Sequence, residues 1–171
     1  MVRLPVWRAA LEFAAALGFA GTAQAVDGLE PFGTPIRSAA EVATELTAAC
    51  EVAVDRGTPM LLEFSAEWCS DCRLLDRMKR VPTLAKELAS WPRVVVNVGR
   101  FDQHRELLEG FGVHSIARWV VLAPTSCTSS PAGWPRQAQR TLEPDSGADK
   151  NVTPEELAVW LAGQRGALAG R

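Results

Sequence analysis

The residues best suited to chemistry in this 171-residue chain are Cys69 and Cys72, which form a CxxC pair. They follow an apolar run, residues 60–64, within five residues, and they begin a segment with helical periodicity, residues 70–80. At the first turn of a helix, unpaired backbone N–H groups and the helix dipole stabilise a thiolate, which is the reactive form of cysteine. The spacing therefore predicts that Cys69 attacks a disulfide and that Cys72, one helical turn further on, resolves the mixed disulfide.

Two other interpretations of a CxxC pair are half of a zinc site and a structural disulfide. A zinc site needs further cysteine or histidine ligands. The sequence contains no second CxxC and no paired histidines that would supply them. The order of strand, CxxC and helix therefore favours redox chemistry over both alternatives.

The residues beside the two cysteines are expected to shape the contact with a substrate. Trp68 precedes the attacking cysteine, and Ser70 and Asp71 lie between the two thiols. Asp71 adds a negative charge near both sulfurs, which opposes thiolate formation. This charge favours a reductant or a disulfide-exchange catalyst over a strong oxidant.

Hydrophobic periodicity and breaker residues indicate the elements that must position the CxxC pair. A capping box of Ser38 and Glu41 begins the first helix, and Thr153 with Glu156 begins the last. Between them, apolar runs and helical stripes alternate along the chain. The predicted helices are 39–54, 70–80, 83–90, 103–109 and one from 154, and the predicted strands are 60–64, 94–98, 118–122 and 136–142. This order predicts an α/β fold in which helices flank a central mixed β-sheet.

Length and composition fit one globular domain. Hydrophobic residues make up 47% of the chain and charged residues 22%, as in ordinary folded proteins. We expect a signal peptide at 1–25, a linker at 26–37, the domain at 38–163 and a frayed tail at 164–171. The formal net charge of −2 gives no electrostatic reason to expect nucleic acid or an anionic membrane as a partner.

The first 25 residues have the three parts of a secretory signal peptide. Arg3 and Arg8 supply positive charge, and residues 13–20 form an apolar run that is too short to span a bilayer. Ala23 and Ala25 are the small residues that signal peptidase reads, so cleavage is expected after Ala25. The prediction is a periplasmic or secreted protein with no stable membrane insertion after cleavage. The alternative is an uncleaved amphipathic helix.

The segment around the CxxC pair resembles a known family. Residues 61–72 (LLEFSAEWCSDC) are similar to the active-site segment of the thioredoxin superfamily, and 94–97 and 111–116 are similar to its next strand and the approach to its substrate loop. Within this family, the chain looks most like the bacterial exported thioredoxin-like proteins of the periplasm, which lack the usual proline in the helix after the CxxC; this chain has Arg77 at that place. The resemblance covers about residues 38–162. It implies a thioredoxin-like fold and a thiol–disulfide oxidoreductase without an organic cofactor.

The resemblance also implies a role for Glu63. This residue stands where the family carries a buried acid that relays a proton for the resolving cysteine. Its strand predicts burial too, and a buried carboxylate without a partner is costly unless it is protonated or functional. The alternative is a carboxylate at the strand edge that faces water.

Ile116 and Ala117 fall in the family's substrate loop, and Ala117 replaces the usual cis-proline. A cis peptide bond before a residue other than proline costs about 3 kcal/mol, so a trans bond is expected before Ala117. The family's proline shapes the edge against which a substrate backbone pairs. Its absence leaves the mode of substrate binding open.

Two further cysteines, Cys50 and Cys127, are a candidate structural disulfide, which an exported chain would allow. In a thioredoxin topology, the helix that contains Cys50 ends at the pole opposite the CxxC pair. The strand that begins at Arg118 carries the chain to that same pole, where Cys127 follows. The alternative is a buried Cys50 that acts as a small apolar residue and a free thiol at Cys127.

Together these observations predict a monomeric thiol–disulfide oxidoreductase that acts on protein disulfides and exchanges electrons with a redox partner protein. No metal and no cofactor is assigned to it. The alternative is a non-catalytic thioredoxin-fold binding module in which Cys69, Cys72 and His114 hold a metal ion.

Overall fold

The computed structural model describes residues 33–145, 147 and 151–169, which belong to one compact unit. The predicted signal peptide, its cleavage site after Ala25 and most of the predicted linker lie outside these residues. Among the described residues, no helix combines the length and the apolar character needed to cross a bilayer.

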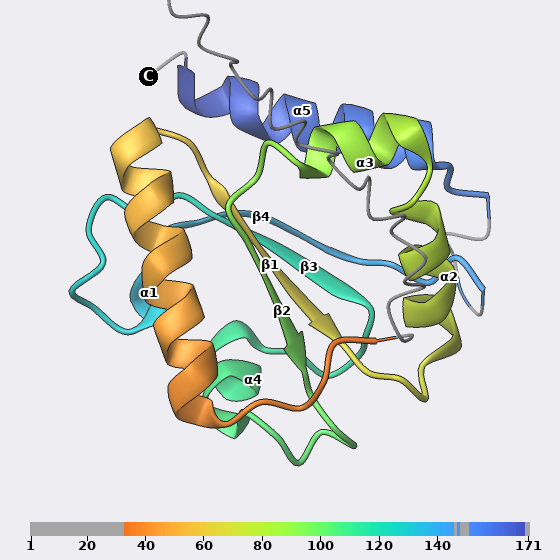
Figure 1. The fold of residues 1–171 in the computed structure, drawn as a ribbon, viewed down its shortest axis with the longest axis horizontal. Coiled ribbons are helices and arrows are strands. Elements are labelled where there is room, and N and C mark those ends of the chain that lie inside the picture. The colour runs from red at the N-terminus through yellow and green to blue at the C-terminus, as the bar shows by residue number, and fades with distance from the viewer. Residues whose placement is uncertain (1–32, 146, 148–150, 170–171) are drawn as a thin grey trace, which may run out of the picture. The chain divides into compact units, whose positions relative to one another are not determined.

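A mixed sheet of four strands forms the centre of the fold, in the order β2-β1-β3-β4 (Figure 1). The central strand β1 (Met60–Ser65) runs parallel to β2 (Arg93–Asn97) and antiparallel to β3 (Arg118–Leu122). The edge strand β4 (Arg136–Thr141) pairs antiparallel with β3. All six residues of β1 are buried, as expected for a continuous apolar strand covered on both faces.

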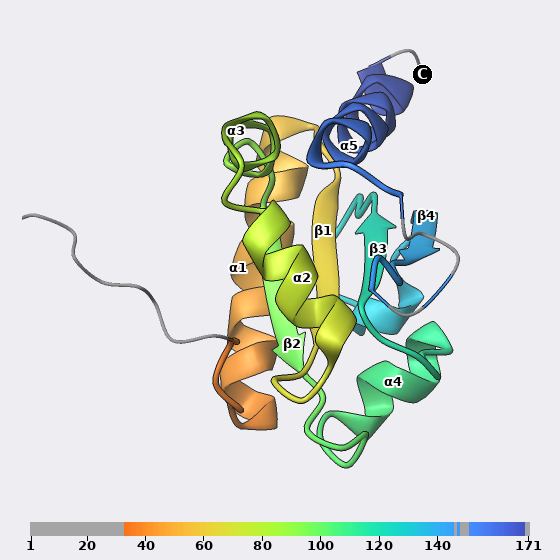
Figure 2. The same cartoon turned by 90° about the vertical axis from the view of Figure 1, so that its right-hand side faces the viewer.

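Helices cover both faces of this sheet. One face carries α1 (Ala39–Arg56) and α4 (Arg105–Phe111), which line a common cavity. The other face carries α2 (Ser70–Met78), which lies in front of β1 and β2 in Figure 2, and α3 (Pro82–Leu88), which packs against α5 (Pro154–Ala169). This arrangement confirms the predicted α/β class with a central mixed sheet.

The alternation of side chains along β1 explains how the two helical layers attach to the sheet. Phe64 points toward α4, where its ring centroid lies 5.9 Å from that of Phe111. Glu63, the preceding residue, points to the opposite face and binds Lys79 at the end of α2. The strand that leads to the CxxC pair is therefore held from both sides.

The last helix continues beyond the predicted domain boundary. Helix α5 runs to Ala169, so the expectation of a frayed tail over 164–171 was wrong for most of that segment. Arg165 makes two hydrogen bonds, of 2.9 and 2.8 Å, to the carboxylate of Glu87 on α3. A partner on another helix stabilises this last part of the helix, and such a partner is not visible in the local sequence.

A disulfide joins Cys50 on α1 to Cys127 in the loop after β3, with 5.9 Å between the two Cα atoms. Cys50 is fully buried and Cys127 is partly buried. The loop then continues into a short 3-10 turn, η1 (Pro131–Gly133), that contacts α4. The disulfide therefore fastens the long β3–β4 connection to the helical layer.

Candidate active site

The chain turns sharply between β1 and α2 and places Cys69 at the N-cap of that helix. The backbone N–H of Cys69 donates to the carbonyl of Ala66 at 3.2 Å, which closes the turn. Cys69 has extended backbone angles, and its Sγ accepts a hydrogen bond from the backbone N–H of Cys72 at 3.1 Å. A side-chain acceptor at this position satisfies one of the free N–H groups of the first turn. The same N–H group would stabilise a thiolate at Cys69.

Cys69 and Cys72 are joined by a disulfide, with 5.2 Å between their Cα atoms. Both residues are recessed, since Cys69 is only 5% exposed and Cys72 only 2%. Ser70, between them, is half-buried and begins α2. The structure therefore represents the oxidised form of the predicted dithiol.

The side chain of Glu63 is fully buried behind α2, so the alternative of a water-facing carboxylate is wrong. One oxygen, Oε1, accepts a hydrogen bond from the ammonium of Lys79 at 2.7 Å. Lys79 also pairs with Asp76, one turn earlier on the same helix, at 2.5 Å. The other oxygen, Oε2, has no hydrogen-bond partner among the described residues, and the guanidinium of Arg93 lies 3.9 Å from it.

Asp71 lies inside the CxxC motif but does not face solvent, since it is 5% exposed. Its Oδ1 accepts a hydrogen bond of 2.6 Å from the backbone N–H of Asp145, in the segment that follows β4. This contact joins the motif to a part of the chain 74 residues away.

Ile116 and Ala117 lie directly beside Cys69. The Sγ of Cys69 is 3.6 Å from the carbonyl oxygen of Ile116. The peptide bond between Ile116 and Ala117 is cis, so the expected trans bond was wrong. A trans bond is the preference of an isolated peptide bond. In the folded protein, however, Ala117 is fully buried, and its carbonyl accepts a hydrogen bond from the backbone N–H of Leu142 at 2.8 Å. Tertiary contacts therefore determine the conformation of this loop.

Trp68 is the large exposed apolar side chain of the site, at 47% exposure. Its indole N–H donates to the carbonyl of Gly99 at 2.6 Å, and its ring centroid lies 6.0 Å from that of Phe101. We call this pair the Trp68–Phe101 ridge. It fixes the orientation of the indole against the loop that follows β2.

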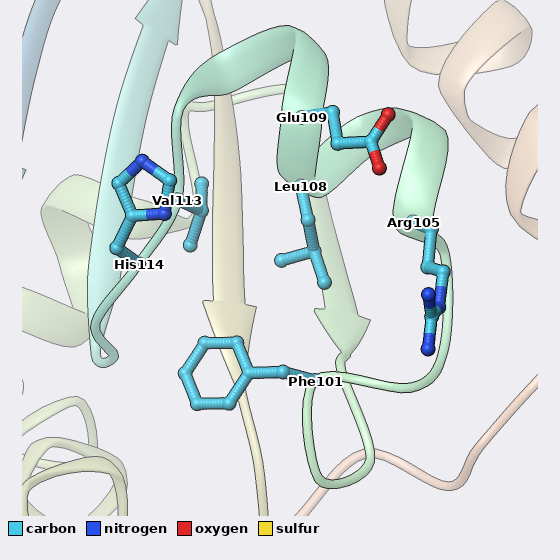
Figure 3. A pocket seen from close by; sticks show the side chains of 6 residues that line it. All are labelled: Phe101, Arg105, Leu108, Glu109, Val113 and His114. Carbon is cyan, nitrogen blue, oxygen red and sulfur yellow. The ribbon is translucent and has the colours of Figure 1, made fainter.

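A cavity of about 360 Å³ lies between Phe101 and α4. Figure 3 shows Leu108, Val113 and Phe101 facing the same space, with Arg105 and His114 on either side of it. The floor of the cavity is thus apolar, and its rim is charged or polar. It is adjacent to the Trp68–Phe101 ridge because Phe101 belongs to both.

His114 lines this cavity and is exposed. Within the described part of the chain, no three His, Cys, Asp or Glu side chains are grouped closely enough to hold a metal ion. The alternative of a metal bound by Cys69, Cys72 and His114 therefore finds no support in the arrangement of these side chains.

Three contributors to the site carried no clear sequence signal: Lys79, Phe101 and the segment 142–145. Lys79 lies at the end of a predicted helix, where a lysine side chain is ordinarily solvated, so its sequence position does not indicate a buried partner. Phe101 has a positive φ of 64°, which is uncommon for a residue with a side chain. A breaker-rich segment such as 142–145 suggests a turn but gives no indication of what that turn contacts.

No family model matches the chain, and no curated protein matches its sequence. Solved structures do resemble it. A disulphide isomerase from Xylella fastidiosa Temecula1 superposes with a TM-score of 0.59 at 23% identity, over 77% of this chain and 96% of that chain. The oxidised C-terminal domain of DsbD from Neisseria meningitidis gives a TM-score of 0.58 at 16% identity, over 77% of this chain and all of that chain. A thioredoxin from Thermus thermophilus gives 0.52 at 18% identity, over 72% and 88%.

At such low sequence identity, these structural similarities establish the fold and nothing more. The chain is a thioredoxin-fold protein with a CxxC pair at the start of the helix that follows the central strand. The expected thioredoxin-like fold is thereby confirmed.

Proposed function

We propose that this chain is a thiol–disulfide oxidoreductase whose redox centre is the Cys69–Cys72 pair. The observation that carries the proposal is the position of Cys69 at the N-cap of α2, with its Sγ hydrogen-bonded to the Cys72 N–H. This arrangement favours the thiolate of the first cysteine and keeps the second within reach of it. Solved structures of the same fold include a disulphide isomerase and a thioredoxin.

The reaction is a sequence of two thiol–disulfide exchanges. In the first, the Cys69 thiolate attacks one sulfur of a protein disulfide and the other sulfur leaves as a thiolate. In the second, the Cys72 thiolate attacks Cys69 in the mixed disulfide, releases the remaining substrate thiolate and closes the Cys69–Cys72 disulfide. The substrate gains two electrons and the dithiol loses two, so a redox partner protein with a dithiol must reduce the pair again.

Glu63 is proposed to take the proton from the Cys72 thiol before the second exchange. It is a buried carboxylate on the face of β1 that α2 covers, and it stands at the position where the resembled family carries its proton-relay acid. Its Oε1 is occupied by Lys79, whereas Oε2 has no hydrogen-bond partner among the described residues. The proton would therefore go to Oε2.

The proposed contact surface for substrate surrounds Cys69. Trp68 and Ser70 flank the sulfur in the chain, and the Ile116–Ala117 loop lies against it, with the Ile116 carbonyl at 3.6 Å. The cavity beyond Phe101 is suited to an apolar side chain of the substrate because its floor is apolar.

The proposed setting is outside the cytoplasm, in the periplasm or the medium, where disulfides persist. The proposal rests on the signal-like residues 1–25 and on the second cysteine pair, Cys50 and Cys127, which the structure joins in a disulfide. We propose that the protein acts as a monomer on exported proteins.

The test is reduction of insulin by dithiothreitol, followed by turbidity, with the protein that begins at Val26. We expect clear acceleration over the uncatalysed rate, and none with Cys69→Ser. A rate for the unaltered protein no higher than that of Cys69→Ser would contradict the proposal and would favour a non-catalytic binding module.

A further inference from the structure

The segment that follows β4 is fastened to the dithiol site at two points. The backbone N–H of Leu142 donates to the carbonyl of Ala117 at 2.8 Å, and the backbone N–H of Asp145 donates to Oδ1 of Asp71 at 2.6 Å. Leu142 and Pro144 are buried, while Asp145 is exposed. Residues 142–145, which we call the wall segment, are thus anchored by backbone donors and by two buried side chains.

The sheet topology places this wall segment on one side of the CxxC pair and the Trp68–Phe101 ridge on the other. Strands β2 and β4 both run parallel to β1, so the loops that follow these three strands lie at the same edge of the sheet. In the order β2-β1-β3-β4, the loop after β2 and the segment after β4 flank the end of β1 from opposite sides. Phe101 belongs to the first and Asp145 to the second.

The attacking sulfur lies in the space between these two flanks. Cys69 is 5% exposed and Cys72 is 2% exposed, although Trp68 next to them is 47% exposed. In a thiol–disulfide exchange, the thiolate must reach one substrate sulfur while the other leaves. A substrate disulfide must therefore enter the space between the two flanks. A disulfide that is embedded in the flat surface of a folded protein cannot enter this space.

We propose that the wall segment, held in place by Asp71, restricts this dithiol to disulfides on extended or flexible segments and excludes those embedded in folded surfaces. The inference rests on the proposed function and assigns Asp71 as a positioning residue for substrate selection. Its carboxylate acts by holding the Asp145 N–H, rather than by touching the substrate.

The test uses substitutions at Asp145, because its contribution is a backbone N–H. Asp145→Pro removes this donor, whereas Asp145→Ala changes the side chain and keeps the donor. Two probes are used: glutathione disulfide, which is small and flexible, and native ribonuclease A, whose disulfides are packed in a folded protein. The readout is the ratio of kcat/KM for ribonuclease A to kcat/KM for glutathione disulfide.

We expect Asp145→Pro to raise this ratio about 10-fold, equivalent to about 1.4 kcal/mol, while Asp145→Ala keeps the ratio of the unaltered protein. A second pair of substitutions, at Asp71, tests the same hydrogen bond in case the proline variant does not fold. Asp71→Ala removes the acceptor and should also raise the ratio, whereas Asp71→Asn keeps an acceptor oxygen. Both variants lose the same charge, so the difference between their ratios reports the loss of the acceptor for the Asp145 N–H.

An unchanged ratio in both Asp145→Pro and Asp71→Ala would overturn the inference, as would an equal rise in the matched controls. These results differ from a failure of the proposed function. If the unaltered protein reduces neither probe, the oxidoreductase proposal fails. If it reduces glutathione disulfide and the ratio does not respond to the substitutions, only the role of the wall segment fails.

Discussion

Glu63 is fully buried, yet its two carboxylate oxygens have different surroundings. Oε1 is bound by Lys79 at 2.7 Å, while Oε2 has no hydrogen-bond partner among the described residues and lies 3.9 Å from the guanidinium of Arg93. A buried carboxylate is tolerated when it is paired, and Lys79 supplies that pairing. A buried carboxylate beneath the CxxC helix, with one oxygen that has no hydrogen-bond partner among the described residues, is suited to accept a proton.

Glu63→Gln is expected to slow the second exchange about 100-fold at neutral pH, the range for loss of a general base. Glutamine keeps an oxygen for Lys79 but is not basic, so the protein should remain folded by circular dichroism. The measurement is stopped-flow decay of the mixed disulfide across a pH series. Glu67→Gln, an exposed carboxylate two residues before Cys69, is the control. Unchanged kinetics at every pH would refute the role of Glu63.

Lys79→Met leaves the buried carboxylate of Glu63 without its closest cation. Removing one partner of a buried ion pair is expected to lower the free energy of unfolding by about 3 kcal/mol at neutral pH. Urea unfolding measures this loss, and Lys86→Met, an exposed lysine on α3, should show almost none. Equal stabilities of the two variants would contradict the account of this pair.

The pH dependence of this pair follows from the pKa of Lys79. Burial favours loss of its proton, but the carboxylates of Glu63 and Asp76 outweigh burial and raise the pKa of Lys79 above its ordinary 10.5. A raised pKa in the folded state contributes stability below the unfolded pKa, and that contribution is lost as pH rises through the folded value. The stability gap between the unaltered protein and Lys79→Met should therefore shrink above pH 10.5.

At the residue scale, the sequence predicts burial of Glu63 because the residue stands inside an apolar run, and the structure agrees. The partner of Glu63 could not be predicted, since Lys79 reaches it only through the packing of α2 on β1. The conformation at Ala117 was missed for a similar reason, because a contact with Leu142, 25 residues further on, is not visible locally.

At the scale of elements, hydrophobic periodicity predicts the helices and strands well and their ends less well. The helix predicted at 103–109 lies at Arg105–Phe111, because His104 has a positive φ of 54° and cannot continue a helix. A positive φ in a residue other than glycine has no dependable sequence signal. The capping box of Ser38 and Glu41, in contrast, marks the start of α1 and is formed as predicted.

The disulfide between Cys50 and Cys127 acts at this same scale, because it ties α1 to the β3–β4 connection. The two cysteines are separated by 77 residues in the sequence. Closing a loop of that length lowers the conformational entropy of the unfolded chain, which stabilises the folded state by about 4 kcal/mol. Cys50→Ala with Cys127→Ala should therefore lower the free energy of unfolding by about that amount in urea titrations. Ser126→Ala, in the same loop, is the control.

The same double variant should leave the reduction potential of the Cys69–Cys72 pair unchanged, because the two disulfides lie in different elements. A shift in that potential, or stability equal to that of Ser126→Ala, would show that this disulfide does not act as a structural brace.

At the scale of the whole molecule, the order of elements along the chain was enough to predict an α/β fold with a mixed sheet. The parallel pair β1–β2 and the antiparallel pairs that follow bring the CxxC turn, the Ala117 loop and the wall segment to one edge of the sheet. Only the first two of these could be predicted, because they lie in segments that resemble known ones. The third depends on how the connection after β4 folds back.

The central claim is that Cys69 attacks a substrate disulfide and that Cys72 resolves the product. The most direct measurement is mass spectrometry of reduced Cys72→Ser after incubation with insulin. We expect a mixed disulfide between Cys69 and an insulin chain, released by dithiothreitol and absent from Cys69→Ser. Equal trapping by the two variants, or trapping by neither, would contradict it.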